Sequence, residues 1–419
     1  MTTAPNKSVD LPFNDSIKAS RASLGGLKGL PSSFRLAAMM LLNTKHGRIT
    51  FTLPDKTRIV FDNETPGADA VVDIHDYRFA KRSIAGGDIG FAESYMDGDW
   101  STPDLTAVLT FFSENFEATG KLAIGSLLVR LTNMLRHVFN RNSKSGSKRN
   151  IEAHYDLGND FYESWLDPSM TYSSALFTDP DMDLTAAQHS KYERISTEIG
   201  LSPGKSVLEI GCGWGGFAEY AAKTHGAKVT CLTISPSQRD YAMARMQTEG
   251  LNDLVEIRLE DYRDHAGAYD GVASIEMFEA VGEKYWPSYF SKIRESLKDN
   301  ARAALQIITI NDDLFESYRK RADFIQHYIF PGGMLPSETA LIEQCDRAGL
   351  KLDDVHYFRK DYARTLRVWT AEFERHWPAI LKMGFDERFR RMWNFYLSYC
   401  EAGFENGRIN VGHFKLSRC

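Results

Sequence analysis

The sequence VLEIGCGWGGF, residues 207–217, carries the strongest fold signal in this chain of 419 residues. A strand is predicted over Ser206–Ile210 and a helix over Phe217–His225, because an apolar run ends in a glycine-rich turn. In the turn, Gly211, Gly213 and Gly216 match the spacing G-x-G-x-x-G, in which bare backbone lets a nucleotide approach closely. The spacing alone does not identify the ligand, because nicotinamide, flavin and adenosylmethionine enzymes all need bare backbone there.

Strands and helices continue to alternate on the C-terminal side of this turn. Strands are predicted over Ala227–Ile234, Val255–Leu259, Asp270–Ile275 and Arg302–Ile310, and a helix over Ser237–Glu249. Alternation of this kind indicates a parallel sheet covered by helices on both faces. We therefore expect an α/β fold with a Rossmann-like sheet.

The ends of the first three strands favour a cationic ligand with an amino acid moiety over a dinucleotide. Glu209, two residues before the first glycine, suits such a cation better than a pyrophosphate. The second strand ends in CLTISPSQ (231–238), which offers Thr233, Ser235 and Gln238 where a nicotinamide site needs an acid. The third ends in LEDYRD, where Asp261 is placed to accept from an adenine amino group. Purely structural glycines are the alternative explanation of the turn.

Bulk composition excludes several classes of function. A net charge of −6 gives no electrostatic reason to bind nucleic acid. The five cysteines lack the paired spacing of zinc sites, which predicts no metal site and a reduced, cytoplasmic setting. We expect no signal peptide in MTTAPNKSVDLPFND and no membrane span, since the longest apolar run is only Leu36–Leu42.

Changes in composition divide the chain into four expected parts. They are a loosely ordered N-terminus (1–30), a small α+β domain (31–117), a basic amphipathic helix with its linker (118–150), and the α/β domain (151–419) with a cap insertion around 311–340. Within the second part, GRITFTLPDKTRIVFD predicts a hairpin, and Gly86, Gly87, Gly90 and Gly98 predict tight turns. Segment 118–150 contains no Asp or Glu, which fits either a helix on an anionic membrane surface or one that packs between domains.

Longer motifs extend the pattern over nearly the whole chain. They are HYDLGNDFYESWLDPSMTYSSALF (154–177), VLEIGCGWGGFAEYAA (207–222), LTISPSQ (232–238), SIEMFEAVG (274–282), YIFPGGMLPS (328–337), DYARTLRVW (361–369) and RFRRMWNFYLSYCEAGF (388–404). On these motifs the chain resembles the cyclopropane fatty acid synthase family, and GGDIGFAESYMDGDW (86–100) resembles the extra N-terminal domain of its full-length members. The resemblance implies a class I methyltransferase sheet with a helical acyl-binding cap.

The resemblance also implies the site residues. The expected contacts of S-adenosyl-L-methionine are Tyr172, Ser173, Glu209, Gly211, Gly213, Gly215, Thr233, Ile234, Ser235, Gln238, Asp261 and Tyr262. The expected catalytic set is Glu279, Tyr362, Ser174 and Tyr172, and Glu279 and Tyr362 are implied to help hold a bicarbonate ion. Glu276 has a weaker claim than Glu279, and the alternatives are a helix-start carboxylate for Glu279 and a packed tyrosine for Tyr362. Aromatic candidates for stabilising a carbocation are Tyr172, Phe278, Phe330 and Tyr362.

Two positions depart from the family's pattern at the bicarbonate site. Ser174 replaces a cysteine and Ile308 replaces a histidine. Ser174 keeps a hydrogen-bond donor, whereas the Ile308 side chain has none. Gln306 lies on the same face of its strand as Ile308 and is a candidate to compensate. Whether bicarbonate binds is therefore open.

These features lead to one hypothesis and two alternatives. The hypothesis is transfer of a methyl group from S-adenosyl-L-methionine to the cis double bond of an acyl chain in a membrane phospholipid, giving a cyclopropane ring. The alternative is C-methylation without ring closure, giving a methyl-branched or methylene chain, and a more distant one is a small-molecule O- or N-methyltransferase. We expect anionic or zwitterionic phospholipids as partners, a peripheral position on the inner face of the cytoplasmic membrane and no nucleic acid, while a homodimer stays open.

Overall fold

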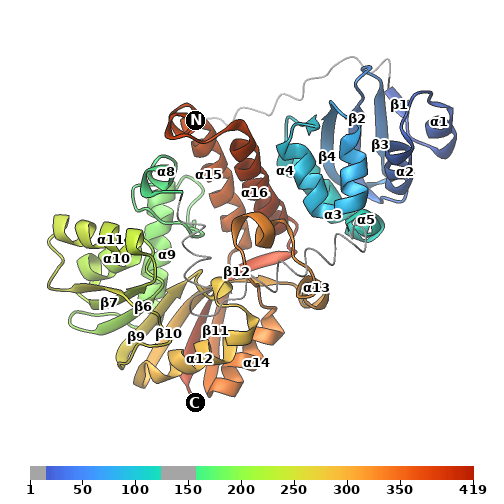
Figure 1. Cartoon of the computed structure of the whole chain (residues 1–419). Coiled ribbons are helices and arrows are strands. Elements are labelled where there is room, and N and C mark those ends of the chain that lie inside the picture. Colours follow the sequence, from blue (N-terminus) through green and yellow to red (C-terminus); the bar gives the residue numbers. More distant parts are fainter. Residues whose placement is uncertain (1–15, 124–156) are drawn as a thin grey trace. The chain divides into compact units, whose positions relative to one another are not determined.

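The computed structural model describes residues 16–123 and 157–419, without the side chains of 120–123. The chain divides into two compact units, Met1–Ser126 and Leu127–Cys419 (Figure 1). Most of the predicted basic segment 118–150 lies outside the described residues, as do residues 1–15. Among the described helices, none has the length and apolar character that a bilayer span requires.

The N-terminal unit contains a mixed sheet in the strand order β1-β3-β2-β4-β5. The predicted hairpin is confirmed, because β2 (His46–Thr52) and β3 (Arg58–Asp62) pair antiparallel. The segment expected to be loosely ordered up to residue 30 contains β1 (Ser16–Lys18) and α1 (Arg21–Gly26), since β1 finds backbone partners on β3. The remaining elements are α2 (Ser32–Leu41), β4 (Thr65–Ile74), α3 (Arg78–Met96), β5 (Trp100–Ser101), α4 (Leu105–Glu114) and α5 (Phe116–Ala123).

Three of the four glycines predicted to mark tight turns lie inside a helix. α3 runs through Gly86, Gly87 and Gly90, and only Gly87 breaks its geometry, with φ of 64°. A Cβ on Gly90 would lie 2.2 Å from the carbonyl oxygen of Arg82, so this glycine serves close packing within the kinked helix. The turn prediction was therefore wrong for Gly86 and Gly90, which lie in helical backbone, whereas Gly87 marks a kink where a positive φ favours glycine.

The C-terminal unit contains a sheet of seven strands in the order β11-β12-β10-β9-β6-β7-β8. The strands from β10 to β8 are parallel, and β12 runs antiparallel between β10 and β11. Their bounds are β6 (Ser206–Ile210), β7 (Lys228–Thr233), β8 (Val255–Leu259), β9 (Tyr269–Ile275), β10 (Leu297–Ile310), β11 (Leu350–Tyr357) and β12 (Ile409–Arg418). The predicted Rossmann-like α/β fold is confirmed.

Helices cover both faces of this sheet (Figure 1). The first face packs on α9 (Leu184–Glu198), α10 (Gly216–His225) and α11 (Pro236–Thr248), and the second on α12 (Trp286–Glu295) and α14 (Glu338–Ala348). The residues of β6 separate accordingly: Val207 belongs to the first core and Leu208 to the second, because successive side chains of a strand point to opposite faces.

Further segments add to the sheet at the carboxyl ends of its strands. α8 (Asn159–Glu163) leads into segment 164–176, whose Ser174 bonds to Glu276 directly after β9. The insertion between β10 and α14 contains α13 (Asp312–Tyr318) and a π-helical turn, η3 (Ile325–Ile329). The long helices α15 (Arg359–Ile380) and α16 (Glu387–Glu405) lie side by side (Figure 1). Single-turn helices are η1 (Phe278–Ala280), η2 (Glu283–Tyr285) and η4 (Leu381–Met383).

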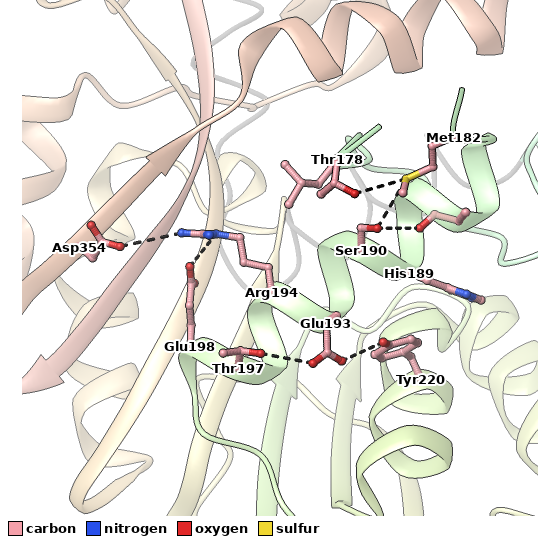
Figure 2. Close-up of a pocket in the computed structure, with 12 residues that line it drawn as sticks. Thr178, Met182, His189, Ser190, Glu193, Arg194, Thr197, Glu198, Tyr220 and Asp354 are labelled. Atoms are coloured by element: carbon pink, nitrogen blue, oxygen red, sulfur yellow. Dashed lines mark hydrogen bonds and ion pairs between the residues drawn. The ribbon is translucent and has the colours of Figure 1, made fainter. Parts of the chain in front are cut away.

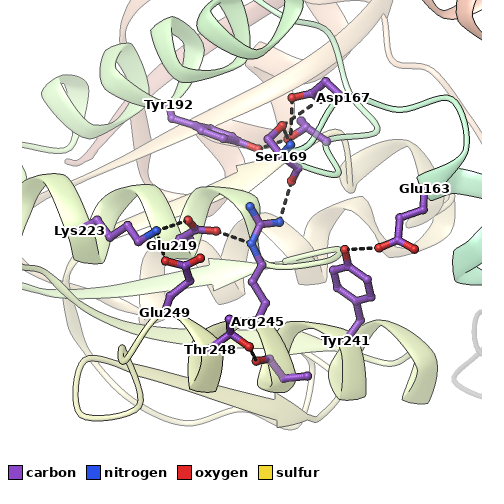
Figure 3. A network of polar contacts seen from close by, with 12 residues as sticks. Glu163, Asp167, Ser169, Tyr192, Glu219, Lys223, Tyr241, Arg245, Thr248 and Glu249 are labelled. Carbon is purple, nitrogen blue, oxygen red and sulfur yellow. Dashed lines mark hydrogen bonds and ion pairs between the residues drawn. The ribbon is translucent and has the colours of Figure 1, made fainter.

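A polar network ties segment 164–176 to the helices beside the glycine turn (Figure 3). Arg245 of α11 donates to the carbonyl oxygen of Ser169 at 2.7 Å and forms an ion pair with Glu219 of α10. Lys223 donates to the same Glu219 carboxylate at 2.6 Å. Because the guanidinium bridges a helix and a loop carbonyl, the segment that carries Tyr172 is fixed against the sheet.

Gly216, the first residue of α10, packs directly beneath this segment. A Cβ at this position would lie 2.5 Å from Oη of Tyr192 and 3.0 Å from the carbonyl oxygen of Ser169. We therefore expect Gly216→Ala to destabilise the C-terminal unit by about 1–3 kcal/mol, measured by urea unfolding followed by circular dichroism. Thr224→Ala, at an exposed position of the same helix, should remain within about 0.5 kcal/mol of the wild type. Superimposable unfolding curves for Gly216→Ala and the wild type would contradict this packing.

Candidate cofactor and catalytic site

The turn after β6 forms a cradle of bare backbone. Gly211, Gly213 and Gly215 adopt φ angles of 82°, 53° and 84°, which lie in the left-handed region that favours glycine. A Cβ on Gly211 would in addition lie 2.5 Å from Cγ of Met277. α10 begins directly behind the turn, so the N–H groups of its first turn lie at the cradle. This geometry fits the close approach of an adenosine-containing ligand.

Glu209 lies at the base of the cradle and is almost completely buried. Its side chain is 2% exposed, and Oε2 accepts a weak hydrogen bond from the Cys231 thiol at 3.5 Å. Burial raises the pKa of Glu209 to about 8, and the thiol and the positive charge of Lys191 act in the opposite direction. A carboxyl group with a pKa of about 8 is mostly protonated at pH 7, and it ionises when a cationic ligand binds beside it because the positive charge lowers its pKa.

The end of β7 carries the polar side chains that the sequence predicted. Thr233, Ser235 and Gln238 are each less than 7% exposed. The Thr233 hydroxyl donates to Oε1 of Gln238 at 3.0 Å and accepts from the Ser235 N–H at 3.2 Å. The Ser235 hydroxyl caps α11 by accepting from the Gln238 N–H at 3.3 Å. These contacts orient the cluster, and the intervening Ile234 remains partly exposed.

Asp261, after β8, is engaged by a neighbouring arginine. Arg263 binds its two carboxylate oxygens at 2.8 Å and 2.5 Å, and the guanidinium lies over the rings of Tyr262 and Tyr285. A carboxylate has about four lone-pair sites, so an adenine amino group can still bind to Asp261. The strand order β9-β6-β7-β8 places Glu209, the Thr233 cluster and Asp261 along one edge of the sheet.

Ser173 lies beside a buried lysine that the sequence reasoning missed. Nζ of Lys191, on α9, donates to the Ser173 hydroxyl at 2.7 Å, and the lysine side chain is 0% exposed. Burial lowers the pKa of Lys191 to about 7, although the carboxylates of Glu276, Asp167 and Glu209 raise it. The HYDLGND-to-YSSALF motif ends before this helix, so no sequence signal pointed to Lys191.

Three donors converge on the carboxylate of Glu276. Oε1 accepts from the Ser174 N–H at 2.8 Å and from the Gln306 amide at 2.7 Å, and Oε2 accepts from the Tyr362 hydroxyl at 2.6 Å. Glu276 itself adopts a left-handed conformation, with φ of 49°, which is uncommon for a residue with a side chain. Such strain persists only where the surroundings enforce it, and it is found most often at functional sites.

Gln306 is held by its own partners. Nε2 of His413 donates to Oε1 of Gln306 at 2.9 Å, and the Gln306 carbonyl accepts from the Glu276 N–H at 2.9 Å. Burial lowers the pKa of His413, so the imidazole is neutral and carries its proton on the nitrogen that faces Gln306. The amide NH₂ group is thereby directed at Glu276.

Glu279, the carboxylate that the sequence favoured, has a poorer set of partners. Its Oε1 accepts from the Ile308 N–H at 2.6 Å, and its buried Oε2 has no hydrogen-bond partner within the described parts of the chain. Tyr362 was expected to act with Glu279, but in the structure its hydroxyl bonds to Glu276. Glu276 therefore has the stronger structural claim.

The two carboxyl groups differ in the neighbours that favour their ionised forms. Burial raises the pKa of both, and the negative charge of Glu276 adds to the effect on Glu279, whose pKa reaches about 8. Three donors and the positive charge of Lys191 favour the ionised form of Glu276, whereas only backbone N–H groups do so for Glu279. Glu276 therefore has more support for its ionised form, and Glu279, with a pKa of about 8, is mostly protonated at pH 7.

Aromatic side chains surround this cluster. The Tyr172 hydroxyl donates to Oη of Tyr396 at 2.8 Å, and the Tyr172 ring packs against Trp369 with centroids 5.3 Å apart. The Tyr362 ring stacks on Phe404 at 4.3 Å. Further aromatic neighbours are Tyr162 and Trp165 beside Tyr172, and Phe330 beside Tyr396. Phe278 is different: it packs into the core on Tyr289 and Phe290, away from Glu276.

An open groove of about 670 Å³ runs along α9 and contains none of the predicted site residues (Figure 2). Charged and polar pairs line it, among them Arg194 with Glu198 at 2.9 Å and Tyr220 with Glu193 at 2.9 Å. His154 and Asp156, which open the HYDLGND motif, lie outside the described residues. The carboxyl edge of the sheet is therefore the candidate site.

The donors implied for bicarbonate are already used by protein carboxylates. The Tyr362 hydroxyl and the Ser174 N–H donate to Glu276, and the Ile308 N–H donates to Glu279. A bicarbonate ion would have to displace one carboxylate and would add a second negative charge beside it. The residues present do not fit this ion, whereas the cradle, Glu209 and the Thr233 cluster fit S-adenosyl-L-methionine.

Comparisons with known proteins identify the family of this chain. The family described as mycolic acid cyclopropane synthetase matches residues 142–414. Tuberculostearic acid methyltransferase UfaA1 of Mycobacterium tuberculosis is 41% identical over 349 residues, which are 81% of each protein. Cyclopropane-fatty-acyl-phospholipid synthase of Escherichia coli K12 is 35% identical over 88% of this chain and 93% of its own. The crystal structure of mycolic acid cyclopropane synthase CmaA1 complexed with SAH and CTAB superimposes with a TM-score of 0.61 at 28% identity, covering 64% of this chain and 97% of that one.

The family model matches most of the C-terminal unit. The two relatives align with more than four fifths of the chain, so their similarity also includes part of the N-terminal unit. The chain therefore belongs to the mycolic acid cyclopropane synthetase family and is an S-adenosyl-L-methionine-dependent methyltransferase.

Proposed function

We propose that this enzyme transfers the methyl group of S-adenosyl-L-methionine to the cis double bond of an unsaturated acyl chain of a membrane phospholipid. The observation that carries the proposal is a carboxyl group, Glu276, bonded to the hydroxyl of Tyr362, whose ring packs against Phe404 and Trp369. An oxygen or nitrogen substrate would not need this arrangement. An alkene does, because methylation leaves a carbocation on the chain. Aromatic faces stabilise this cation, and a base must remove a proton from it to give a neutral product.

The chain's own residues divide the task between the sheet edge and the added helices. When bound, S-adenosyl-L-methionine supplies an electrophilic methyl group on a sulfonium centre. The glycine cradle and Glu209 would hold its amino acid and adenosine parts, and Asp261 would accept from the adenine. Tyr172 and its tryptophan neighbours would keep water from the reacting carbon, since an alkene competes poorly with water for a methyl group.

Ring closure is the first proposed outcome, and formation of a methyl-branched or methylene chain is the second. The relative named cyclopropane-fatty-acyl-phospholipid synthase supports the first. The second is supported by the 41% identity to a relative whose name specifies a methyltransferase, and by Ile308, which supplies no polar side chain to the site. We further propose that the enzyme meets its substrate at the surface of the membrane.

The proposal is tested by expressing the enzyme in bacteria that lack their own synthase, fed with methionine deuterated on its methyl group. We expect unsaturated phospholipid acyl chains to gain one labelled carbon, which has lost a single deuterium if a ring or a methylene group forms and keeps all three if a methyl branch forms by loss of a chain proton. Mass spectrometry of the fatty acids measures the gain, and proton NMR of the product from a parallel culture with unlabelled methionine separates a cyclopropane ring from a methylene group.

The matched control uses purified enzyme and vesicles of one headgroup that differ only in their acyl chains. Vesicles with cis-unsaturated chains should be labelled, and vesicles with saturated chains should not. Labelling of neither, together with methylation of a small amine or phenol, would refute the proposed substrate.

A second prediction concerns Glu209, whose pKa of about 8 means that it is mostly protonated at pH 7. If its carboxylate pairs with the cationic ligand, binding lowers this pKa and releases a proton at pH 7 but not at pH 9. Affinity should accordingly rise as the pH rises toward 8 and then level off. Calorimetry in buffers of different ionisation enthalpy measures the number of protons released.

Glu209→Gln should abolish this proton release and weaken binding. Glu198→Gln provides the control, because Glu198 is also a largely buried acid with a raised pKa but pairs with Arg194 beside the α9 groove. Equal proton release by the Glu209→Gln variant and the wild type would remove Glu209 from the cofactor site.

A further inference from the structure

We infer that Glu276 is the enzyme's own proton acceptor and takes the place of an external anion such as bicarbonate. This inference rests on the proposed methylation of an acyl double bond and names the group that completes that reaction. It follows from the position of the Glu276 carboxylate, which receives the Ser174 N–H and the Tyr362 hydroxyl, the donors that an external anion would need.

The geometry leaves one position on the carboxylate for a proton. Oε1 accepts two hydrogen bonds, from Ser174 and Gln306, while Oε2 accepts one, from Tyr362. Since a carboxylate offers about four lone-pair sites, a site remains on Oε2. Glu276 also keeps partial solvent accessibility, although Gln306 and Ser174 are both 0% exposed. The open lone-pair site on Oε2 is therefore the one that we assign to the proton.

The same three hydrogen bonds explain why a protein carboxylate is safe beside a methyl donor. A free carboxylate would compete with the alkene for the methyl group. Donors from Ser174, Gln306 and Tyr362 spread its charge and fix its orientation, which lowers its nucleophilicity while leaving it basic enough to accept a proton from a carbocation.

The electrons and protons of the reaction balance with Glu276 as acceptor. The carbon–sulfur bond of the donor breaks with both electrons going to sulfur, and the π electrons of the alkene form the new carbon–carbon bond. The neighbouring chain carbon becomes cationic. Glu276 Oε2 takes one proton from the new methyl group, and the electrons of that carbon–hydrogen bond either close the ring or, after a hydride shift, form a methylene double bond. Glu276 becomes a neutral acid in both cases.

The neighbouring carboxyl group supports this assignment. Glu279 accepts the Ile308 N–H, and its protonated form adds no second charge to the pocket. Gln306, held by His413, supplies the donor that Ile308 cannot offer through its side chain. The two differences from the family's pattern, at Ser174 and Ile308, thus occur together with a site that has its own proton acceptor and does not need bicarbonate.

The test compares the wild type with Glu276→Gln and Glu276→Gly in carbon-dioxide-free buffer. The glutamine variant keeps the shape and removes the base, and the glycine variant opens the space of the carboxylate at a position whose φ of 49° suits glycine. Glu198→Gln, a carboxylate outside the site, is the control and should keep its activity. Calorimetry with S-adenosyl-L-homocysteine shows that each variant is folded.

We expect full activity of the wild type on cis-unsaturated phospholipid vesicles without bicarbonate, and a loss of about 10²–10⁴-fold for both variants. Added bicarbonate or formate should restore part of the activity of Glu276→Gly but not of Glu276→Gln, because only glycine leaves room for the ion. Retained turnover by Glu276→Gln, or a wild type that needs added bicarbonate, would overturn the inference.

Binding of isotope-labelled bicarbonate, followed by NMR on the homocysteine-loaded proteins, provides a readout that does not depend on turnover. Bicarbonate should bind to Glu276→Gly and not to the wild type. If the wild type methylates no acyl lipid at all, the proposed function fails, while this comparison still decides the inference: bicarbonate bound to the wild type contradicts it, and bicarbonate bound only to the glycine variant supports it.

Discussion

The hydrogen bonds to the Glu276 carboxylate join three segments that are distant in sequence. Ser174 is 102 residues away, Tyr362 is 86 and Gln306 is 30. Segment 164–176, helix α15 and β10 all donate to this carboxylate, so one side chain connects the loop that carries Tyr172 with the helix that carries Tyr362. An apolar or absent side chain at this position would leave a backbone N–H, an amide and a hydroxyl without this acceptor, which is costly in a protein interior.

The site concentrates ionisable groups where water is scarce. Lys191, Glu209, Glu276 and Glu279 lie in one region, and burial shifts the pKa of each toward its neutral form. Isolated buried charges are costly, and here Lys191 offsets part of that cost by favouring the ionised forms of Glu209 and Glu276, while Glu279, with a pKa of about 8, is mostly protonated at pH 7. The arrangement suits a cationic ligand, since the arriving positive charge stabilises the ionised form of Glu209 and leaves less charge uncompensated.

The sheet edge and the helices packed beyond it contribute different residues to the candidate site. The sheet edge supplies the glycine cradle and the polar cluster after β7, which any enzyme with this fold can use for a nucleotide-like ligand. The helices beyond the sheet supply what is particular to this chain: α9 brings Lys191, α15 brings Tyr362 and α16 brings Tyr396. Ile308 and Gln306 lie on β10, which β9 separates from β6, so these two positions can differ without disturbing the cradle.

The sequence by itself determined the sheet, the glycine turn and the family. β6 and β8 have the predicted bounds, because strand alternation and the backbone freedom of Gly211 and Gly213 are local properties of the chain. Only the tertiary structure decided between the two glutamates of SIEMFEAVG, which both follow the same strand. It also paired β1 with β3 and buried Lys191 beside Ser173. Choices of this kind depend on which distant donor packs against a side chain, and neither periodicity nor motif spacing contains that information.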